Sequence, residues 1–258
     1  MTAPGRATAS AATPTGRLGL RRVPMILMYH GVADVAEDPH LLCVPPARFA
    51  EQMAWLKRRG LRGVGIGTLV DAMGRGQARK LVGITFDDGY TSVLDKALPV
   101  LKRHGFGASV FIISGRLGGT NDWDEGPVFP LMSGAQVREL AAEPGIEIGS
   151  HSQTHVRLAG LTREQLAAEV GGSKAALTAL LDAPVRGFAY PYGSMDAAAR
   201  RAVQDAGYDY ACAVEAPVAE IGRMALPRIY VGQRDGAGRM AAKRLLYRGY
   251  IAVNGRRQ

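Results

Sequence analysis

The chain has 258 residues, of which 47% are hydrophobic and 21% are charged, a composition typical of a globular protein. This length is sufficient for one large α/β domain with a sizeable core. The formal net charge is +9, but residues 1–22 carry four arginines and no acid, and residues 234–258 carry a net +6, which leaves residues 23–233 at −1. A protein that binds nucleic acid is expected to carry basic charge on its folded body, so this distribution argues against that class of function.

The two basic ends are expected to lie outside the body of the domain. Residues 1–22 are rich in Ala, Thr, Gly and Pro and lack an apolar stretch, which predicts a disordered tail and not a secretory signal. Residues 23–258 form a single predicted domain, and residues 234–258 are its basic C-terminal extension with an amphipathic helix at 237–248. This extension is either a solvated tail or a weak contact for an anionic membrane surface. No apolar run has the length of a membrane span, so the expected location is cytoplasmic.

Strand and helix patterns alternate from residue 24 to residue 231. The expected strands are residues 24–29, 62–66, 81–86, 108–113, 146–148, 187–190, 208–214 and 225–231. The expected helices are residues 46–60, 68–73, 92–104, a helix capped by Ser133, 162–181 and 196–206. Seven or eight such units predict parallel strands with covering helices, and they favour a (β/α) barrel over an open sheet.

Two adjacent carboxylates, Asp87 and Asp88, follow the apolar strand at residues 81–86, and Gly89 follows them. In isolation, Asp-Asp-Gly is ordinary turn chemistry. Ligands of barrels and open α/β sheets, however, bind at the carboxyl ends of the strands, where these two acids lie. The position therefore makes both residues candidates for a functional site.

A pair of histidines, His151 and His155, begins at the end of another expected strand. Their spacing of four residues brings two imidazoles to one face if the segment turns helically, and it is typical of zinc sites. Asp87 and Asp88 should point in different directions because they are neighbours on an extended chain. One of them can therefore complete a three-ligand site with an open position, while the other acts as a base. The residues alone do not decide which acid does which.

The order of three motifs resembles that of polysaccharide deacetylases, also called carbohydrate esterase family four or NodB-homology domains. The motifs are Thr85-Phe-Asp-Asp-Gly89, His151-Ser-Gln-Thr-His155 and Phe188-Ala-Tyr-Pro-Tyr-Gly193, and the resemblance spans residues 24–231. It implies a distorted (β/α)7 barrel and a hydrolase that removes acetyl groups from N-acetylated sugars. It also implies roles for five residues: Asp87 as general base, Asp88, His151 and His155 as ligands of one divalent ion, and Tyr192, whose backbone N–H helps to hold the oxyanion. Tyr190 is a further candidate for the substrate or oxyanion site, although both tyrosines could simply pack at the rim of the barrel.

The chain departs from the family pattern at two places. Many members carry an arginine in the third motif that braces the catalytic base, and Ala189 stands there. No histidine motif for the general acid follows residue 193, whereas His30 ends the first expected strand. This arrangement is similar to the circularly permuted poly-N-acetylglucosamine deacetylases, which implies that His30 is the general acid.

Several alternatives stay open at this level. The ion is expected to be Zn²⁺, but Ni²⁺, Co²⁺ or Fe²⁺ would also suit two imidazoles and a carboxylate. The same residues could cleave O-acetyl esters such as those of xylan, and the loss of arginine at Ala189 would suit an inactive glycan-binding barrel. A phosphotransfer enzyme is disfavoured because no Gly-rich phosphate loop is present. Trp123, on a long expected loop, either anchors that loop or stacks on a sugar ring, and Cys43 and Cys212 are expected to be unpaired, buried thiols.

Overall fold

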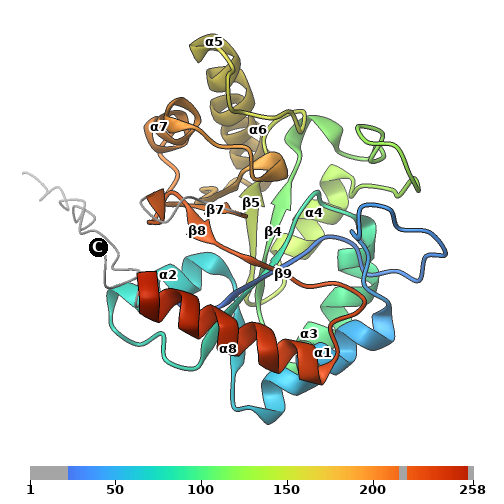
Figure 1. The fold of residues 1–258 in the computed structure, drawn as a ribbon. Coiled ribbons are helices and arrows are strands. Elements are labelled where there is room, and N and C mark those ends of the chain that lie inside the picture. Colours follow the sequence, from blue (N-terminus) through green and yellow to red (C-terminus); the bar gives the residue numbers. More distant parts are fainter. Residues whose placement is uncertain (1–22, 215–219, 255–258) are drawn as a thin grey trace, which may run out of the picture.

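The computed structural model describes residues 23–214 and 220–254, and the expected tail at residues 1–22 lies outside them. Nine strands form one parallel sheet that curls into a barrel with helices around it (Figure 1). The strands are β1 (Ile26–Tyr29), β2 (Arg62–Val64), β3 (Leu81–Phe86), β4 (Ala108–Ile112), β5 (Ile146–Ser150), β6 (Gly187–Ala189), β7 (Tyr210–Ala213), β8 (Leu226–Pro227) and β9 (Ile229–Tyr230). The α-helices are α1 (Pro46–Arg58), α2 (Ile66–Gly74), α3 (Leu98–His104), α4 (Gly134–Ala141), α5 (Arg163–Leu166), α6 (Ser173–Leu181), α7 (Ala197–Asp205) and α8 (Ala237–Asn254).

One short segment, residues 226–230, completes the barrel. The sequence predicts a single strand at 225–231, but the structure divides it: β8 pairs with β7, whereas β9 pairs with β1. Because Pro227 has no N–H to donate, it limits the ladder at this point. Arg228 is the residue between the two pairings. The strand order β8-β7-β6-β5-β4-β3-β1-β9 thus runs around seven positions, with β2 added beside β3, and the expected barrel is confirmed.

Alternation along the strands separates two apolar clusters. One cluster lies between the sheet and the outer helices and contains Leu27, Val82, Val110 and Phe188. The other fills the barrel and contains Ile26, Phe111 and Tyr210 from the strands together with Ile66, Leu69, Val70 and Met73 from the region of α2. Helix α2 therefore packs its apolar side against the barrel interior at the amino-terminal ends of the strands, and does not cover the outer face of the sheet.

Glycines on the inward face make room for this filling. A methyl group at Gly83 would lie 2.6 Å from Cδ1 of Ile66, and one at Gly149 would overlap the ring of Phe111. A methyl group at Gly187 would likewise overlap the ring of Tyr210. The barrel is narrow, so each large inward side chain requires a small one on a neighbouring strand.

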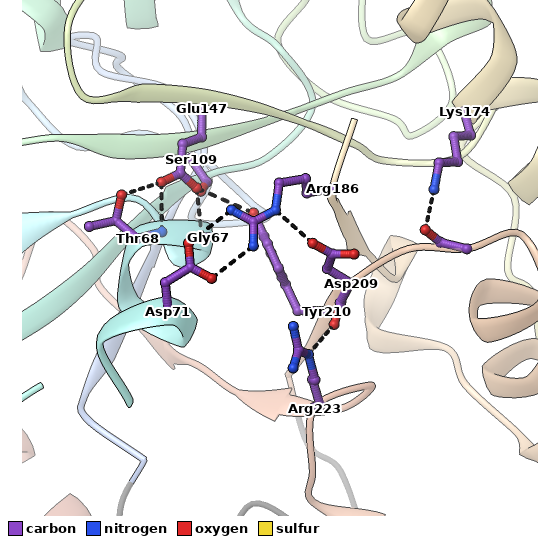
Figure 2. A network of polar contacts seen from close by, with 11 residues as sticks. Gly67, Thr68, Asp71, Ser109, Glu147, Lys174, Arg186, Asp209, Tyr210 and Arg223 are labelled. Carbon is purple, nitrogen blue, oxygen red and sulfur yellow. Dashed lines mark hydrogen bonds and ion pairs between the residues drawn. The ribbon is translucent and has the colours of Figure 1, made fainter. Parts of the chain in front are cut away.

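A polar network fastens α2 at the amino-terminal ends of the strands (Figure 2). The carboxylate of Glu147, on β5, accepts hydrogen bonds from the backbone N–H groups of Gly67 (2.6 Å) and Thr68 (2.8 Å) and from the Thr68 hydroxyl (2.7 Å). A negative charge at a helix N-terminus is stabilising because the first N–H groups have no partner within the helix. Arg186 adds a second tie, since it donates to Asp71 on α2 and to Asp209 before β7.

Several helices begin or end where the sequence predicts. Two of the expected helices, however, contain a π-helical turn, which is wider than an α-helical turn. Ser133 and Thr162 form capping boxes with Gln136 and Gln165, and Gly105 ends α3 with a φ of 65°. The expected helix at 92–104 starts with a π turn at Val93–Ala97, and the expected helix at 162–181 contains another at Ala167–Gly172. Such wide turns are frequently found at functional sites.

Helix α8 is longer than the expected 237–248 and packs on the domain near α1 (Figure 1). Two of its own residues, Met240 and Tyr247, are buried against the domain. The Tyr247 hydroxyl donates to the carbonyls of Val23 and Pro24. Among the described residues, none of the helices combines the length and the apolar composition that a bilayer crossing requires.

We expect Glu147→Ala to lower the free energy of unfolding by about 2 kcal/mol, because the N-terminus of α2 would lose its carboxylate partner and its acceptors. Glu143→Ala is the matched control, since its carboxylate pairs only with the exposed Lys102 and should matter by less than about 1 kcal/mol. Urea unfolding followed by circular dichroism measures both. Equal losses in the two variants would show that the network does not hold α2.

Candidate active site

Strand register brings three of the expected residues to one end of the barrel interior. Tyr29 pairs with Phe86, so His30 and Asp87 leave β1 and β3 at the same level. Ile112 pairs with Ser150, which places His151 just beyond the end of β5. Tyr29, Phe86 and Ser150 face outward, so the next residue on each strand faces inward. The carboxyl ends of the strands therefore carry the site, as expected for parallel strands with covering helices.

Asp87 and Asp88 have separate partners, as their neighbouring positions require. Asp87 continues β3 and its N–H donates to the carbonyl of Tyr29. Asp88 has a φ of 70°, a left-handed conformation that turns its carboxylate away from that of Asp87. Both side chains are buried, with residue exposures of 2% and 4%. Each acid thus has an environment of its own within one site.

The partner of Asp87 is Arg228, which the sequence analysis did not identify. Nη1 and Nη2 of Arg228 donate to the two carboxylate oxygens of Asp87 at 2.6 and 2.8 Å, and Nη1 also donates to the Thr85 hydroxyl at 3.2 Å. The guanidinium lies 5.8 Å from the centre of the Phe111 ring. The sequence held one signal: an arginine inside an apolar strand pattern must either face solvent or find a buried acid.

This ion pair controls the protonation of Asp87. Burial by itself raises the pKa of the Asp87 carboxyl, but the positive charge of Arg228 and its two hydrogen bonds hold that pKa below its usual range. An arginine therefore braces this carboxylate although Ala189 replaces the arginine of the third motif. It comes from the segment that closes the barrel, far along the chain from that motif.

Asp88, His151 and His155 form a buried three-donor cluster whose candidate ligand atoms all lie within 4.8 Å of one another. Oδ1 of Asp88 lies 3.4 Å from Nε2 of His151 and 3.3 Å from Nε2 of His155. Within the described part of the chain, this oxygen has no hydrogen-bond partner. Two ligand atoms about 2.0–2.1 Å from a tetrahedral ion are about 3.3 Å apart, so the cluster fits one small divalent cation.

The orientation of His151 is set by a backbone carbonyl. Its Nδ1 lies 2.8 Å from the oxygen of Ala189 and donates to it, which leaves the lone pair of Nε2 facing the cluster. Burial is the largest influence on this imidazole and lowers its pKa to about 4. His151 is therefore neutral near pH 7, the form that binds a metal. Ala189 takes part in the site through its main chain.

The segment from His151 to His155 is not helical, so the two imidazoles meet for another reason. Ser152 and His155 have φ values of 64° and 69°, and the Ser152 hydroxyl accepts a hydrogen bond from the His155 N–H at 3.0 Å. Glu169, in the π turn at residues 167–172, accepts the N–H groups of Gln153 and Thr154 at 3.0 Å each. The two imidazoles are thus brought together by a tight loop, which is held by hydrogen bonds to Glu169, and not by a turn of helix.

Two aromatic residues flank His155 at the rim. The ring centres of Trp123 and Tyr192 each lie 4.6 Å from that of His155. Tyr192 is 39% exposed and has a φ of 56°, and its hydroxyl donates to Asp124 on the same loop as Trp123. The guanidinium of Arg157 lies 4.3 Å from the centre of the Tyr192 ring. The long loop and the third motif therefore meet beside the cluster.

Tyr190 does not reach the site, contrary to the expectation. It follows Ala189, which faces the barrel interior, so its own side chain points outward. It is fully buried against Phe188, with ring centres 5.3 Å apart, and its hydroxyl donates to the carbonyl of Met224. Its place in the third motif reflects packing between the sheet and the outer helices.

The structure also places the other histidines and the cysteines. His30 is half-buried at the end of β1, near enough to Asp87 and Asp88 for its charge to favour their ionised forms. Its Nδ1 is buried and has no partner among the described residues. His40 lies in a surface loop beside the carbonyl of Glu125, and His104 ends α3. Cys43 and Cys212 are buried and unpaired, as expected.

Left-handed backbone is concentrated at this end of the barrel. Of the seven non-glycine residues with positive φ in the described chain, four lie in the site: Asp88, Ser152, His155 and Tyr192. Each such conformation costs about 1–3 kcal/mol and persists only where the surroundings impose it. Two of the three members of the cluster are among them, which indicates a site maintained for a function.

Comparison with known proteins agrees with this site. The family model described as polysaccharide deacetylase matches residues 74–211, which include both acids and both cluster histidines but neither His30 nor Arg228. YxkH of Bacillus subtilis (strain 168), named as a polysaccharide deacetylase, is 31% identical over 210 residues, which are 80% of this chain and 70% of that protein.

Two further relatives are more distant. The poly-beta-1,6-N-acetyl-D-glucosamine N-deacetylase of Staphylococcus aureus (strain MRSA252) is 23% identical over 181 residues, 67% of this chain and 61% of that one. The Streptococcus pyogenes deacetylase PplD, solved in complex with acetate, shares the fold with a TM-score of 0.73 at 22% identity, over 85% of this chain and 97% of that one. The family match and the similarity to YxkH are decisive: this chain belongs to the polysaccharide deacetylase family.

Proposed function

We propose that the protein hydrolyses the acetamide of N-acetylated sugars in a poly- or oligosaccharide, with one divalent ion held by Asp88, His151 and His155. The observation that carries the proposal is the buried three-donor cluster beside an acid that is held ionised by Arg228. A ligand set of two imidazoles and one carboxylate leaves a coordination position open. When bound, the ion supplies Lewis-acid activation of the acetyl group.

Asp87 is the proposed general base. It is ionised at neutral pH, since Arg228 holds its pKa below the usual range, and its carboxylate is fixed by two hydrogen bonds. A base that does not move loses little entropy when it takes a proton from water. Asp88 is less suited to this role because it faces the two imidazoles.

His30 is the proposed general acid, because a departing amine must be protonated and this imidazole stands at the same level as Asp87. The Tyr192 N–H is the proposed oxyanion donor. Tyr192 lies in the tight turn Pro191–Gly193, where its left-handed backbone interrupts any helical hydrogen bonding. Trp123 and Tyr192 stand beside His155 at the rim, and aromatic rings at such a position suit contact with a sugar ring.

The N-acetyl substrate class rests on the name of the Staphylococcus aureus relative, which deacetylates poly-beta-1,6-N-acetyl-D-glucosamine. An O-acetyl esterase would use the same residues. Acetate release from poly-N-acetylglucosamine, chitooligosaccharides and acetylxylan, with and without added Zn²⁺, separates the two. If acetate is released from acetylxylan alone, the substrate is an O-acetyl ester and not the proposed N-acetyl amide. If none of the three substrates releases acetate, a glycan-binding barrel without activity is favoured. The pairing of Asp87 with Arg228 argues against that last outcome.

We expect the purified protein to contain one equivalent of a divalent metal, and we expect chelation to abolish turnover. His151→Ala and His155→Ala should each lose tight metal binding, since two ligands seldom hold a catalytic ion. His104→Ala, at the end of α3, is the control and should keep its metal. Elemental analysis and turnover with and without chelator measure this. Activity that survives chelation in metal-free protein would contradict the assignment.

We expect Arg228→Ala to lower the free energy of unfolding by about 3–5 kcal/mol, because the substitution leaves the buried Asp87 carboxylate without a compensating charge. Arg228→Lys keeps the charge but not the two-point contact, so its turnover should fall at least about tenfold while its metal content stays normal. Arg186→Lys is the matched control, because it weakens a similar arginine pair at the other end of the barrel. Equal turnover in the two lysine variants would remove Arg228 from the mechanism.

We expect His30→Gln and His30→Ala to lower turnover about 10²–10⁴-fold with the metal retained, the usual contribution of a positioned acid. His40→Ala tests whether loss of an imidazole from the nearby surface matters, and it should leave turnover unchanged. If both His30 variants turn over at the wild-type rate, the acid must be sought elsewhere.

A further inference from the structure

Helix α8 exposes two adjacent leucines. Met240 and Tyr247 attach the helix to the domain, whereas Leu245 and Leu246 face away from it and are 71% and 72% exposed. These are the most exposed large hydrophobic side chains in the described chain, and they are adjacent. Single exposed leucines are common, but a pair on a helix that already has a buried face calls for a partner.

The same helix carries only positive charge. Residues 237–254 contain Arg239, Lys243, Arg244 and Arg248 and no acid. The nearest acid along the chain, Asp235, is 3% exposed and pairs with Lys243 at 2.6 Å. The arginines of the helix have no ion-pair partner within the described residues. The outer surface of α8 is therefore both apolar and cationic.

A second element extends this surface. A hollow of about 430 Å³ lies beside the helix and is lined by Leu41, Arg234, Arg239 and Leu246, among other residues. Leu41 comes from the loop after β1 and is itself 43% exposed. We call the set Leu41, Arg234, Arg239, Arg244, Leu245, Leu246 and Arg248 the α8 patch. The patch combines exposed leucines from two segments with four arginines.

We propose that the α8 patch binds the surface of an anionic lipid bilayer. A helix with leucines and arginines on its outer side lies in the plane of the interface, with the leucines in the acyl boundary and the guanidinium groups at the lipid phosphates. A second copy of the chain is a poor occupant, because a two-fold contact would bring the arginines together without an acid to compensate. The proposal does not depend on the reaction that the site catalyses.

Co-sedimentation of the full chain with vesicles tests this. We compare phosphatidylcholine vesicles with vesicles that also contain phosphatidylglycerol, at low and at raised salt. Binding should require the anionic lipid and weaken with salt. Leu245→Ser/Leu246→Ser should weaken it by about tenfold or more per leucine. Each arginine near an anionic surface contributes about fivefold, so Arg239→Gln/Arg244→Gln/Arg248→Gln should lower binding on the order of a hundredfold.

The control removes the same charge elsewhere: Lys96→Gln/Arg103→Gln/Arg163→Gln changes three exposed basic residues outside the patch. It should bind vesicles like the wild type, and thermal unfolding should confirm that all variants fold. Equal binding to neutral vesicles, or unchanged binding by both α8 variants, would overturn the proposal. The proposal would also be overturned if the protein did not bind vesicles and sedimentation velocity showed a dimer that is lost in the leucine variant.

Discussion

The ion pair between Asp87 and Arg228 is the interaction on which the rest of the site depends. Two charges at 3% and 0% side-chain exposure are stable only as a pair, because either one alone would carry an uncompensated desolvation cost. Arg228 stands between residues 226–227, which pair with β7, and residues 229–230, which pair with β1. The segment that closes the barrel therefore also positions the partner of the proposed base. The proposed chemistry thus uses the C-terminal part of the fold as well as the motif strand.

The interior of the barrel shows how a small fold can hold such a pair. Helix α2 and the rings of Phe111 and Tyr210 fill the lower layers, and glycines on the facing strands leave the space for them. Glu147 fixes the start of α2, so the filling cannot slide along the barrel axis. The side chains beneath the site are buried and mostly apolar, and such low-dielectric surroundings strengthen charge interactions. A tightly packed interior holds the groups of a catalytic site in a fixed geometry, which preorganisation requires.

The cluster of Asp88, His151 and His155 combines a buried polar atom without a hydrogen-bond partner and unfavourable backbone conformations. Asp88 Oδ1 has no hydrogen-bond partner in the described chain, and two of the three residues have left-handed backbone. Capping by Ser152 and Glu169 and the carbonyl of Ala189 hold the ligands in this arrangement. An ion there would satisfy the buried oxygen, so metal binding and local stability should be coupled.

The sequence by itself determined the alternating strands and helices, the capped helix starts, and the acids and histidines at strand ends, because these depend on local periodicity and on residues close along the chain. It also indicated that Asp87 and Asp88 point in different directions, although the left-handed backbone of Asp88, and not an extended strand, produces this divergence. It could not identify Arg228 as the partner of Asp87, because 141 residues separate them and only barrel closure joins them. It could not place α2 at the amino-terminal opening of the barrel or Tyr190 outside the barrel, since both follow from strand register and layer volume. The tertiary structure decided those points because buried charge and close packing are satisfied across strands, not along the chain.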